Sequence, residues 1–153
     1  MASFRNWRRL FGCGLAICLL APGALDADLT QAKAESNLEK RSKLARDNAT
    51  AEYQAARSAY QKGEEALVSS AIAEIEESVE LAYASLTQTG KNPRRSPKWF
   101  KKAEIETRDL LRKLESFQQE MSFTERPALE KVKARVQQVH DDLLLGLMEG
   151  KHK

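Results

Sequence analysis

The fold class of this chain is set by the segment LVSSAIAEIEESVELAYASLTQ, Leu67 to Gln88. Apolar residues recur there every three or four positions, at Leu67, Ala71, Ile75, Val79, Ala82 and Leu86. That spacing places them on one face of an α-helix, which completes a turn in about 3.6 residues. No proline occurs from Asp28 to Thr89. We therefore expect a helix that ends near Gln88 and buries this stripe.

The segment before this stripe is also rich in helix-forming residues, but its first part is polar on all sides. Leu29 to Thr50 has few large apolar residues, so we expect a polar helical extension over residues 28–50. The bundle is expected to span residues 51–149, with a tail at 150–153. Gly63, in YQKGEE, has two interpretations. It either ends the first helix as a turn or kinks one long N-terminal helix, because the stripe stays in phase across it.

Two more helices are expected after the break TGKNPRRSP, which begins at Thr89. Gly90 suits the residue after a helix end, and Ser96-Pro97 suits the start of the next helix. That helix has an apolar stripe formed by Trp99, Ala103, Leu110, Leu114, Phe117 and Met121. Short connections favour antiparallel neighbours. The sequence therefore predicts an all-α, up-down antiparallel bundle of three to four helices.

The final helix has apolar residues at a spacing close to a heptad repeat. They are Leu129, Val132, Val136, Val139, Leu143 and Leu147. Such a seam is typical of helices that pair with another helix in a coiled coil. The sequence therefore predicts that this seam is a surface for self-association, and that the protein forms a homo-oligomer.

Residues 1–27 have the layout of a cleaved export signal. Arg5, Arg8 and Arg9 precede an apolar run from Leu10 to Leu20, and ALDA offers small residues for cleavage. The run is shorter than the roughly 20 apolar residues that a membrane-spanning helix needs. We therefore expect the mature protein in the periplasm or secreted.

Loss of this signal would change the chemistry of the chain. Both cysteines, Cys13 and Cys18, would leave with it, so no thiol chemistry would remain. The 25 basic residues would fall to 22 and the 22 acidic residues to 21, which takes the net charge from +3 to +1. The basic balance is thus partly a property of the signal and does not indicate a nucleic-acid partner.

The C-terminal half resembles a known family. The stretch RRSPKWFKKAEIETRDLLRKLESFQQEMSFTERP, followed by VQQVHDDLLLGLM, is similar to a family of exported bacterial helical proteins. This resemblance implies an exported helical protein and implies no activity. AYQKGEEA also resembles the turn of a tetratricopeptide repeat, although no second copy follows at a period of about 34 residues.

The sequence lacks the usual patterns of catalysis and metal binding. It has no CxxCH, HExxH or G-x-S-x-G motif and no glycine loop for a phosphate. We therefore expect no enzymatic activity and no cofactor. One alternative is a haem- or metal-binding bundle, in which His140 and Met121 would be the ligands from facing helices.

Charge is strongly segregated along the chain. Gly63 to Gly90 contains six acidic residues and no basic one, and Lys91 to Lys102 contains six basic residues and no acidic one. In an antiparallel hairpin, Glu76 and Glu80 should face the region from Ile105 to Lys113. The expected basic partners in that region are Arg108, Arg112 and Lys113.

The basic turn, defined here as Lys91 to Lys102, has no acidic residue near it in the preceding helix. Lys98 and Lys101 also occupy the first turn of a helix, where the macrodipole disfavours cations. The sequence therefore predicts a site that docks an anionic surface. The alternative is a solvated connection between two helices, in which Trp99 packs into the core. The residues of this predicted site are Lys91, Arg94, Arg95, Lys98, Trp99, Lys101 and Lys102.

These observations predict an exported, non-enzymatic helical interaction or scaffold protein of the cell envelope. Its partner would be a protein or an envelope component, such as an anionic lipid or a cell-wall polymer. An alternative is a periplasmic helical chaperone or stress protein, which would need an exposed apolar concave face.

Overall fold

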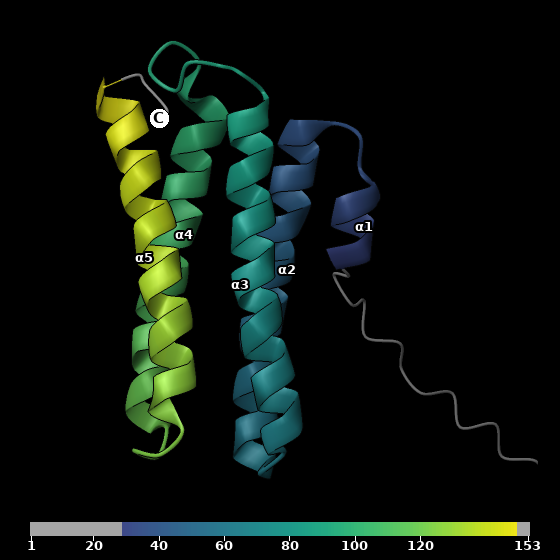
Figure 1. The fold of residues 1–153 in the computed structure, drawn as a ribbon, viewed down its shortest axis with the longest axis vertical. Coiled ribbons are helices and arrows are strands. Elements are labelled where there is room, and N and C mark those ends of the chain that lie inside the picture. The colour runs from purple at the N-terminus through teal and green to yellow at the C-terminus, as the bar shows by residue number, and fades with distance from the viewer. Residues whose placement is uncertain (1–28, 150–153) are drawn as a thin grey trace, which may run out of the picture.

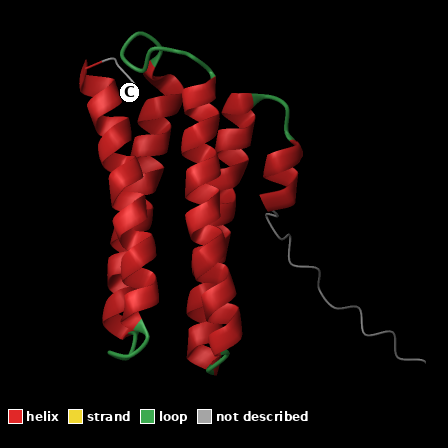
Figure 2. Cartoon of the chain, viewed as in Figure 1, coloured by secondary structure: helices red, strands yellow, loops and turns green. Residues whose placement is uncertain are grey.

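The computed structural model of the chain describes residues 29–149, and all regular structure in that range is helical (Figures 1 and 2). The helices are α1 (Leu29–Ala34), α2 (Leu38–Lys62), α3 (Glu65–Gln88), α4 (Pro97–Glu120) and α5 (Arg126–Glu149). The predicted all-α bundle is thus confirmed. The predicted export signal at residues 1–27, with its cysteines, and the predicted tail at 150–153 lie outside the described residues.

Two helical hairpins make up the bundle (Figure 1). One consists of α2 and α3, the other of α4 and α5, and each pair runs antiparallel. The hairpins pack so that α3 lies beside α5 and α2 lies beside α4. The connection from α3 to α4 therefore crosses a diagonal of the bundle, and these two helices touch only weakly.

Gly63 is a turn and not a kink. It adopts a left-handed conformation with φ 73°, and its N–H donates to the carbonyls of Ala59 and Tyr60. Glycine reaches this conformation at little cost because it has no Cβ. The chain reverses here, and α3 returns along α2.

The predicted boundary at residue 50 is wrong. α2 runs without interruption from Leu38 to Lys62 and buries Ala45, Asn48 and Ala49 in its first half. This half has few large apolar residues because its buried face is built from small ones, which let α2 approach α3 closely. α1 covers the outside of this region, with Leu29 and Ala32 packed on Ala45 and Ala82.

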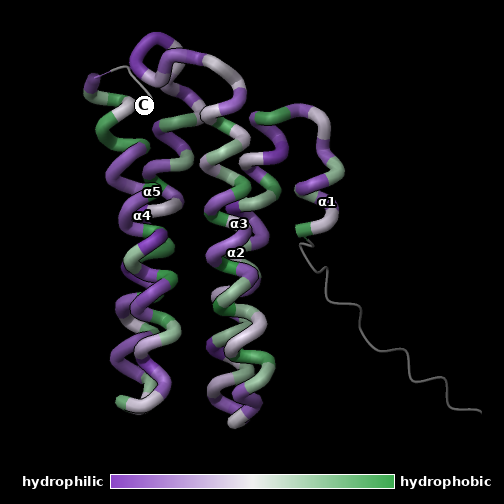
Figure 3. The backbone as a smooth tube through the Cα atoms, in the orientation of Figure 1, coloured by the Kyte–Doolittle hydropathy of each residue, from purple (hydrophilic) through white to green (hydrophobic). Residues whose placement is uncertain are grey.

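The main core lies between the two hairpins and contains apolar residues of all four long helices. Figure 3 shows apolar residues recurring along each of these helices. Phe117 is fully buried and packs edge-on against two rings of α2. Its ring centroid lies 6.2 Å from that of Tyr53 and 5.6 Å from that of Tyr60. The predicted α3 stripe is confirmed except at its start. Leu67 is 57% exposed, and the neighbouring Val68 is buried in its place.

The final-helix seam packs inside the same chain. Five of its residues, Leu129, Val132, Val136, Val139 and Leu143, are at most 2% exposed, and Leu147 is partly buried against the core. The prediction that these residues form a self-association surface is therefore corrected. The heptad spacing arises from packing against α3 and α4, and a second copy could reach it only if the bundle opened.

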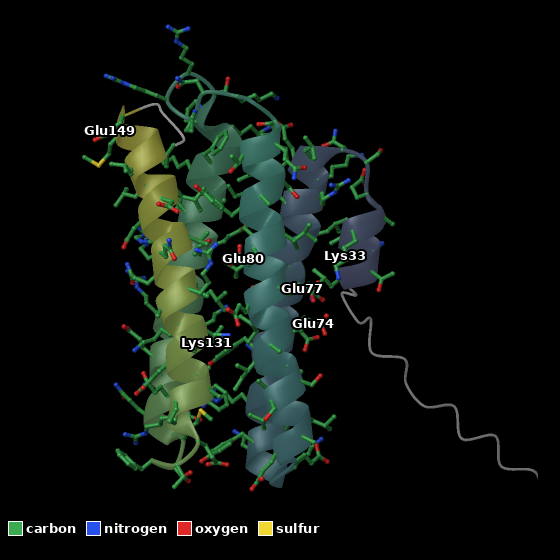
Figure 4. All side chains as sticks on the ribbon, in the orientation of Figure 1. Lys33, Glu74, Glu77, Glu80, Lys131 and Glu149 are labelled. Carbon is green, nitrogen blue, oxygen red and sulfur yellow. The ribbon has the colours of Figure 1, made fainter. Side chains whose placement is uncertain are left out.

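Four ion pairs join the two hairpins along their edges. Two connect α2 to α4 and two connect α3 to α5. They are Arg46–Glu106 (Nε to Oε2, 2.5 Å), Arg57–Glu120 (Nη2 to Oε1, 2.7 Å), Lys131–Glu76 (Nζ to Oε2, 3.4 Å) and Arg135–Glu80 (Nη2 to Oε2, 2.7 Å). Figure 4 shows Lys131 on α5 directed toward α3.

The predicted partners of the acidic helix are therefore wrong. Glu76 and Glu80 pair with α5, whereas Arg108 pairs with Glu104 and Arg112 with Asp109 along α4 itself. Lys113 instead lies 5.9 Å from the ring centroid of Tyr53. The reason is the diagonal connection, which places α5 rather than α4 beside α3.

The Glu80–Arg135 pair predicts a pH dependence of stability. Hydrogen bonds from Arg135 lower the pKa of Glu80 below its ordinary value of 4.5. A carboxylate with a lowered folded-state pKa contributes stability above its unfolded pKa and loses that contribution as the pH falls below it. Glu80→Gln should therefore lower the free energy of unfolding by at most about 1 kcal/mol at pH 7, because the pair is largely solvated. Urea denaturation at pH 7 and at pH 3 should show this difference shrinking in acid. An equal difference at both pH values would contradict the assignment.

Candidate functional site

The basic turn is a defined loop at the end of the bundle where α3 stops and α4 starts. Gly90, with φ 63°, redirects the chain after α3. The side chain of Asn92 accepts hydrogen bonds from the backbone N–H groups of Arg94 (3.0 Å) and Arg95 (3.2 Å). Pro93 is fully buried and anchors the loop to the bundle. The loop therefore holds Arg94 and Arg95 on a fixed, outward-facing turn.

The aromatic part of the predicted docking site is only partly available. Phe100 is 1% exposed and belongs to the main core, whereas Trp99 is half-buried and packs against that core. Lys98 Nζ lies 5.5 Å from the Trp99 ring centroid, within the range of a cation–π contact. Trp99 thus closes the end of the core and supports Lys98, which matches the alternative in which it packs inward.

Two cations of the basic turn have carboxylate partners. Lys91 Nζ lies 2.6 Å from Glu39 of α2, and Lys102 Nζ lies 3.7 Å from Glu106 on its own helix. The Glu39 contact comes from outside the sequence neighbourhood, so the local sequence did not predict it. These two pairs hold the turn against the bundle and reduce its net charge.

The other four cations are exposed and have no carboxylate partner within residues 29–149. They are Arg94, Arg95, Lys98 and Lys101, of which Lys98 has the Trp99 ring as a partner. Most cations elsewhere in the described range pair with a carboxylate, a carbonyl, an amide oxygen or a ring, with Lys40 and Lys62 as exceptions. Figure 3 colours most residues of the loop between α3 and α4 as hydrophilic, and nitrogen-tipped side chains project from the same loop in Figure 4.

This arrangement concentrates positive potential at one end of the molecule. Lys98 and Lys101 lie in the first turns of α4, whose dipole also directs partial positive charge outward. Ser96 provides no side-chain hydrogen bond to that helix end. Such a surface attracts anions.

His140 does not form a site with Met121. Its Nε2 lies 3.2 Å from Glu104 Oε1 and its Nδ1 lies 3.1 Å from Asp141 Oδ1, with the ring largely buried. Met121 lies 17 residues beyond Glu104 on α4, or about 25 Å along the helix. Among residues 29–149, no three His, Cys, Asp or Glu side chains form a group suited to a metal ion. The histidine ties α5 to α4 at the edge of the core.

A small cavity lies at the centre of the bundle, and the sequence analysis did not predict it. Its volume is about 20 Å³, close to that of one water, and its polar lining comes mainly from Arg46, Glu106, Thr107 and Tyr83. Arg46 is 5% exposed, and its Nη2 atom has no hydrogen-bond partner in the described part of the chain. The cavity is too small for a haem or a similar cofactor.

Comparisons with protein-family models, with curated proteins and with solved structures found no match to this chain. Within residues 29–149, none of the helices combines the length and apolarity needed to span a bilayer.

Proposed function

We propose that this protein is an exported, non-enzymatic helical interaction module that docks on an anionic lipid surface of the cell envelope through the basic turn. The observation that supports this proposal is the grouping of Arg94, Arg95, Lys98 and Lys101 at one end of a bundle in which most other cations are paired. Two of them weaken the start of α4, so their position is not explained by stability.

The electrostatic attraction between the basic turn and an anionic membrane is sufficient for reversible docking. Each Lys or Arg held near an anionic membrane surface contributes about 1 kcal/mol. Four cations without a carboxylate partner would contribute about 4 kcal/mol at low salt, and screening would remove much of this as the ionic strength rises. The half-buried Trp99 adds little to such contact because its ring already packs against the core.

The other candidate functions receive less support from the described residues. A chaperone would need a joined apolar concave face, whereas the most exposed large apolar residues lie at opposite ends. Leu67 and Phe123 lie at the end with the Gly63 turn, and Leu144, Leu145 and Met148 lie at the end with the basic turn. A haem bundle would need a larger core cavity than the one beside Arg46.

Removing charge from the basic turn should weaken docking. In the chain that starts at Asp28, which retains all described core contacts, Arg94→Gln/Arg95→Gln should partition about 30-fold less onto vesicles of equal parts phosphatidylglycerol and phosphatidylcholine. This figure follows from about 1 kcal/mol for each lost cation. Co-sedimentation at low salt measures it, and binding to vesicles of phosphatidylcholine alone should be much weaker and the same for both proteins.

The matched control removes the same charge elsewhere. Lys62 and Arg112 are exposed and lie toward the opposite end of the bundle. Lys62→Gln/Arg112→Gln should therefore keep nearly the full affinity for the anionic vesicles. Equal losses in the two double variants would mean that net charge alone governs binding and would overturn the proposed role of the basic turn.

A further inference from the structure

An exposed apolar patch lies on the last turns of α5. Leu144 is 41% exposed, Leu145 is 47% exposed and Met148 is 68% exposed. Leu144 and Met148 are four residues apart, so their side chains are neighbours on the helix surface, and Leu145 extends the patch to one side. The core face of the same turns is formed by Leu143, Gly146 and Leu147. The α5 apolar patch, Leu144, Leu145 and Met148, therefore faces away from the core.

This patch is at the same end of the bundle as the basic turn. α5 runs toward that end and stops at Glu149, which Figure 4 labels there, and the loop from α3 to α4 occupies the same end in Figure 1. Leu144 lies five residues before the end of α5, so the patch is within about 8 Å of the tip along the helix axis. Interfacial helices bury their apolar faces to a similar depth, about 5–10 Å below the lipid head groups.

We infer that the bundle docks end-on, with the α5 apolar patch inserted into the lipid interface while the basic turn contacts the anionic head groups. This inference rests on the proposed function and adds to it the orientation and the apolar component of binding. Stable attachment to a membrane surface generally needs such a second contribution besides charge. The patch supplies what Trp99 cannot, because the indole ring packs against the core.

The acidic residues nearby are compatible with this orientation. Glu149 follows Met148 at the tip of α5 and is repelled by an anionic surface, as are the exposed Asp141 and the half-buried Asp142 about one turn before Leu145. The four cations of the basic turn that lack a carboxylate partner outnumber these three carboxylates. Asp141 Oδ1 also lies 2.8 Å from Gln137 Nε2 and 3.1 Å from His140 Nδ1. Both partners of this carboxylate are therefore farther from the tip of α5 than the patch is.

The test compares two variants of the chain that starts at Asp28. In Leu144→Ser/Leu145→Ser/Met148→Ser the patch becomes polar, and in Phe123→Ser an 85% exposed apolar residue is removed from the opposite end. Binding to the phosphatidylglycerol–phosphatidylcholine vesicles is measured at low salt and in high salt, where the electrostatic part is screened. The triple variant should bind at least about tenfold more weakly in high salt, since burial of apolar surface is lost. Phe123→Ser should bind like the unmodified chain.

Each outcome separates the inference from the function on which it rests. Equal binding of the triple variant and the unmodified chain in high salt would overturn end-on insertion and leave docking by the basic turn in place. Absence of binding by the unmodified chain at low salt would overturn both. Sedimentation velocity without vesicles provides a further check. A dimer of the unmodified chain that becomes a monomer in the triple variant would show that a second copy, and not lipid, covers the patch.

Discussion

Phe117→Ala should lower the free energy of unfolding by about 3–5 kcal/mol, the range for removing a buried aromatic ring. Phe117 is fully buried, and its ring packs edge-on against Tyr53 and Tyr60 of α2. The substitution removes both ring contacts and leaves a cavity where the two hairpins meet. Urea denaturation followed by circular dichroism at 222 nm measures the loss.

The control for this substitution is Phe123→Ala, six residues further along the chain. Phe123 is 85% exposed in the turn between α4 and α5, so its replacement should change the free energy of unfolding by less than about 0.5 kcal/mol. A small effect of Phe117→Ala would mean that the two hairpins do not pack as described.

The second large effect concerns the Arg46–Glu106 pair, in which the Arg46 side chain is 5% exposed and the Glu106 side chain is 35% exposed. Glu106→Gln should destabilise the protein by about 2–3 kcal/mol, because it leaves a buried guanidinium without its carboxylate. Arg46 is 5% exposed and already has one unpartnered nitrogen, Nη2. Arg46→Met should therefore be neutral or stabilising, since it removes the buried charge and fills similar space. The same urea titration measures both variants.

Two comparisons test the reason for this asymmetry. The double variant Arg46→Met/Glu106→Gln should recover most of the stability lost in Glu106→Gln. Glu120→Gln breaks the exposed pair with Arg57 on the same two helices and should have little effect. If Arg46→Met cost as much as Glu106→Gln, the pair would contribute net stability and the argument from desolvation would fail.

Much of the fold could be predicted from the spacing of apolar residues. The stripes of α3 and α5 are strongly periodic. Gly90 follows the end of α3 and Ser96-Pro97 starts α4, as expected. Gly63 remained ambiguous because the stripe stays in phase across it, and only the packing of α3 on α2 decides between turn and kink. The burial of the first half of α2 was missed because alanine and serine give a weak signal on a face that packs closely.

The sequence also contains the information needed to decide which aromatic residue at the start of α4 is buried. Trp99 and Phe100 are adjacent, and both are large and aromatic. Phe100 is the one in phase with Ala103, Leu110 and the rest of the buried face of α4, a spacing of three and four that could have identified it.

The arrangement of the helices depends on contacts that local sequence does not encode. The ion-pair partners of Glu76 and Glu80 could not be predicted, because they follow from which hairpin faces touch.

The candidate site was predicted in its charges but not in its apolar component. A run of six cations without an acid is visible in the sequence, and four of them have no carboxylate partner within residues 29–149. Leu144, Leu145 and Met148 appear in the sequence as part of an apolar run, LLLGLM, in which core and surface residues cannot be separated by hydropathy alone. Their exposure follows from the rotation of α5 about its axis.

The diagonal connection between α3 and α4 also bears on how the chain folds. Each hairpin is stabilised by contacts between segments that are close in sequence, and closing such short loops costs little entropy. The α2–α3 hairpin is the more closely packed of the two and is complete at Gln88. It can therefore form early in folding, and its apolar face, which belongs to the core between the hairpins, is covered when the second hairpin packs against it.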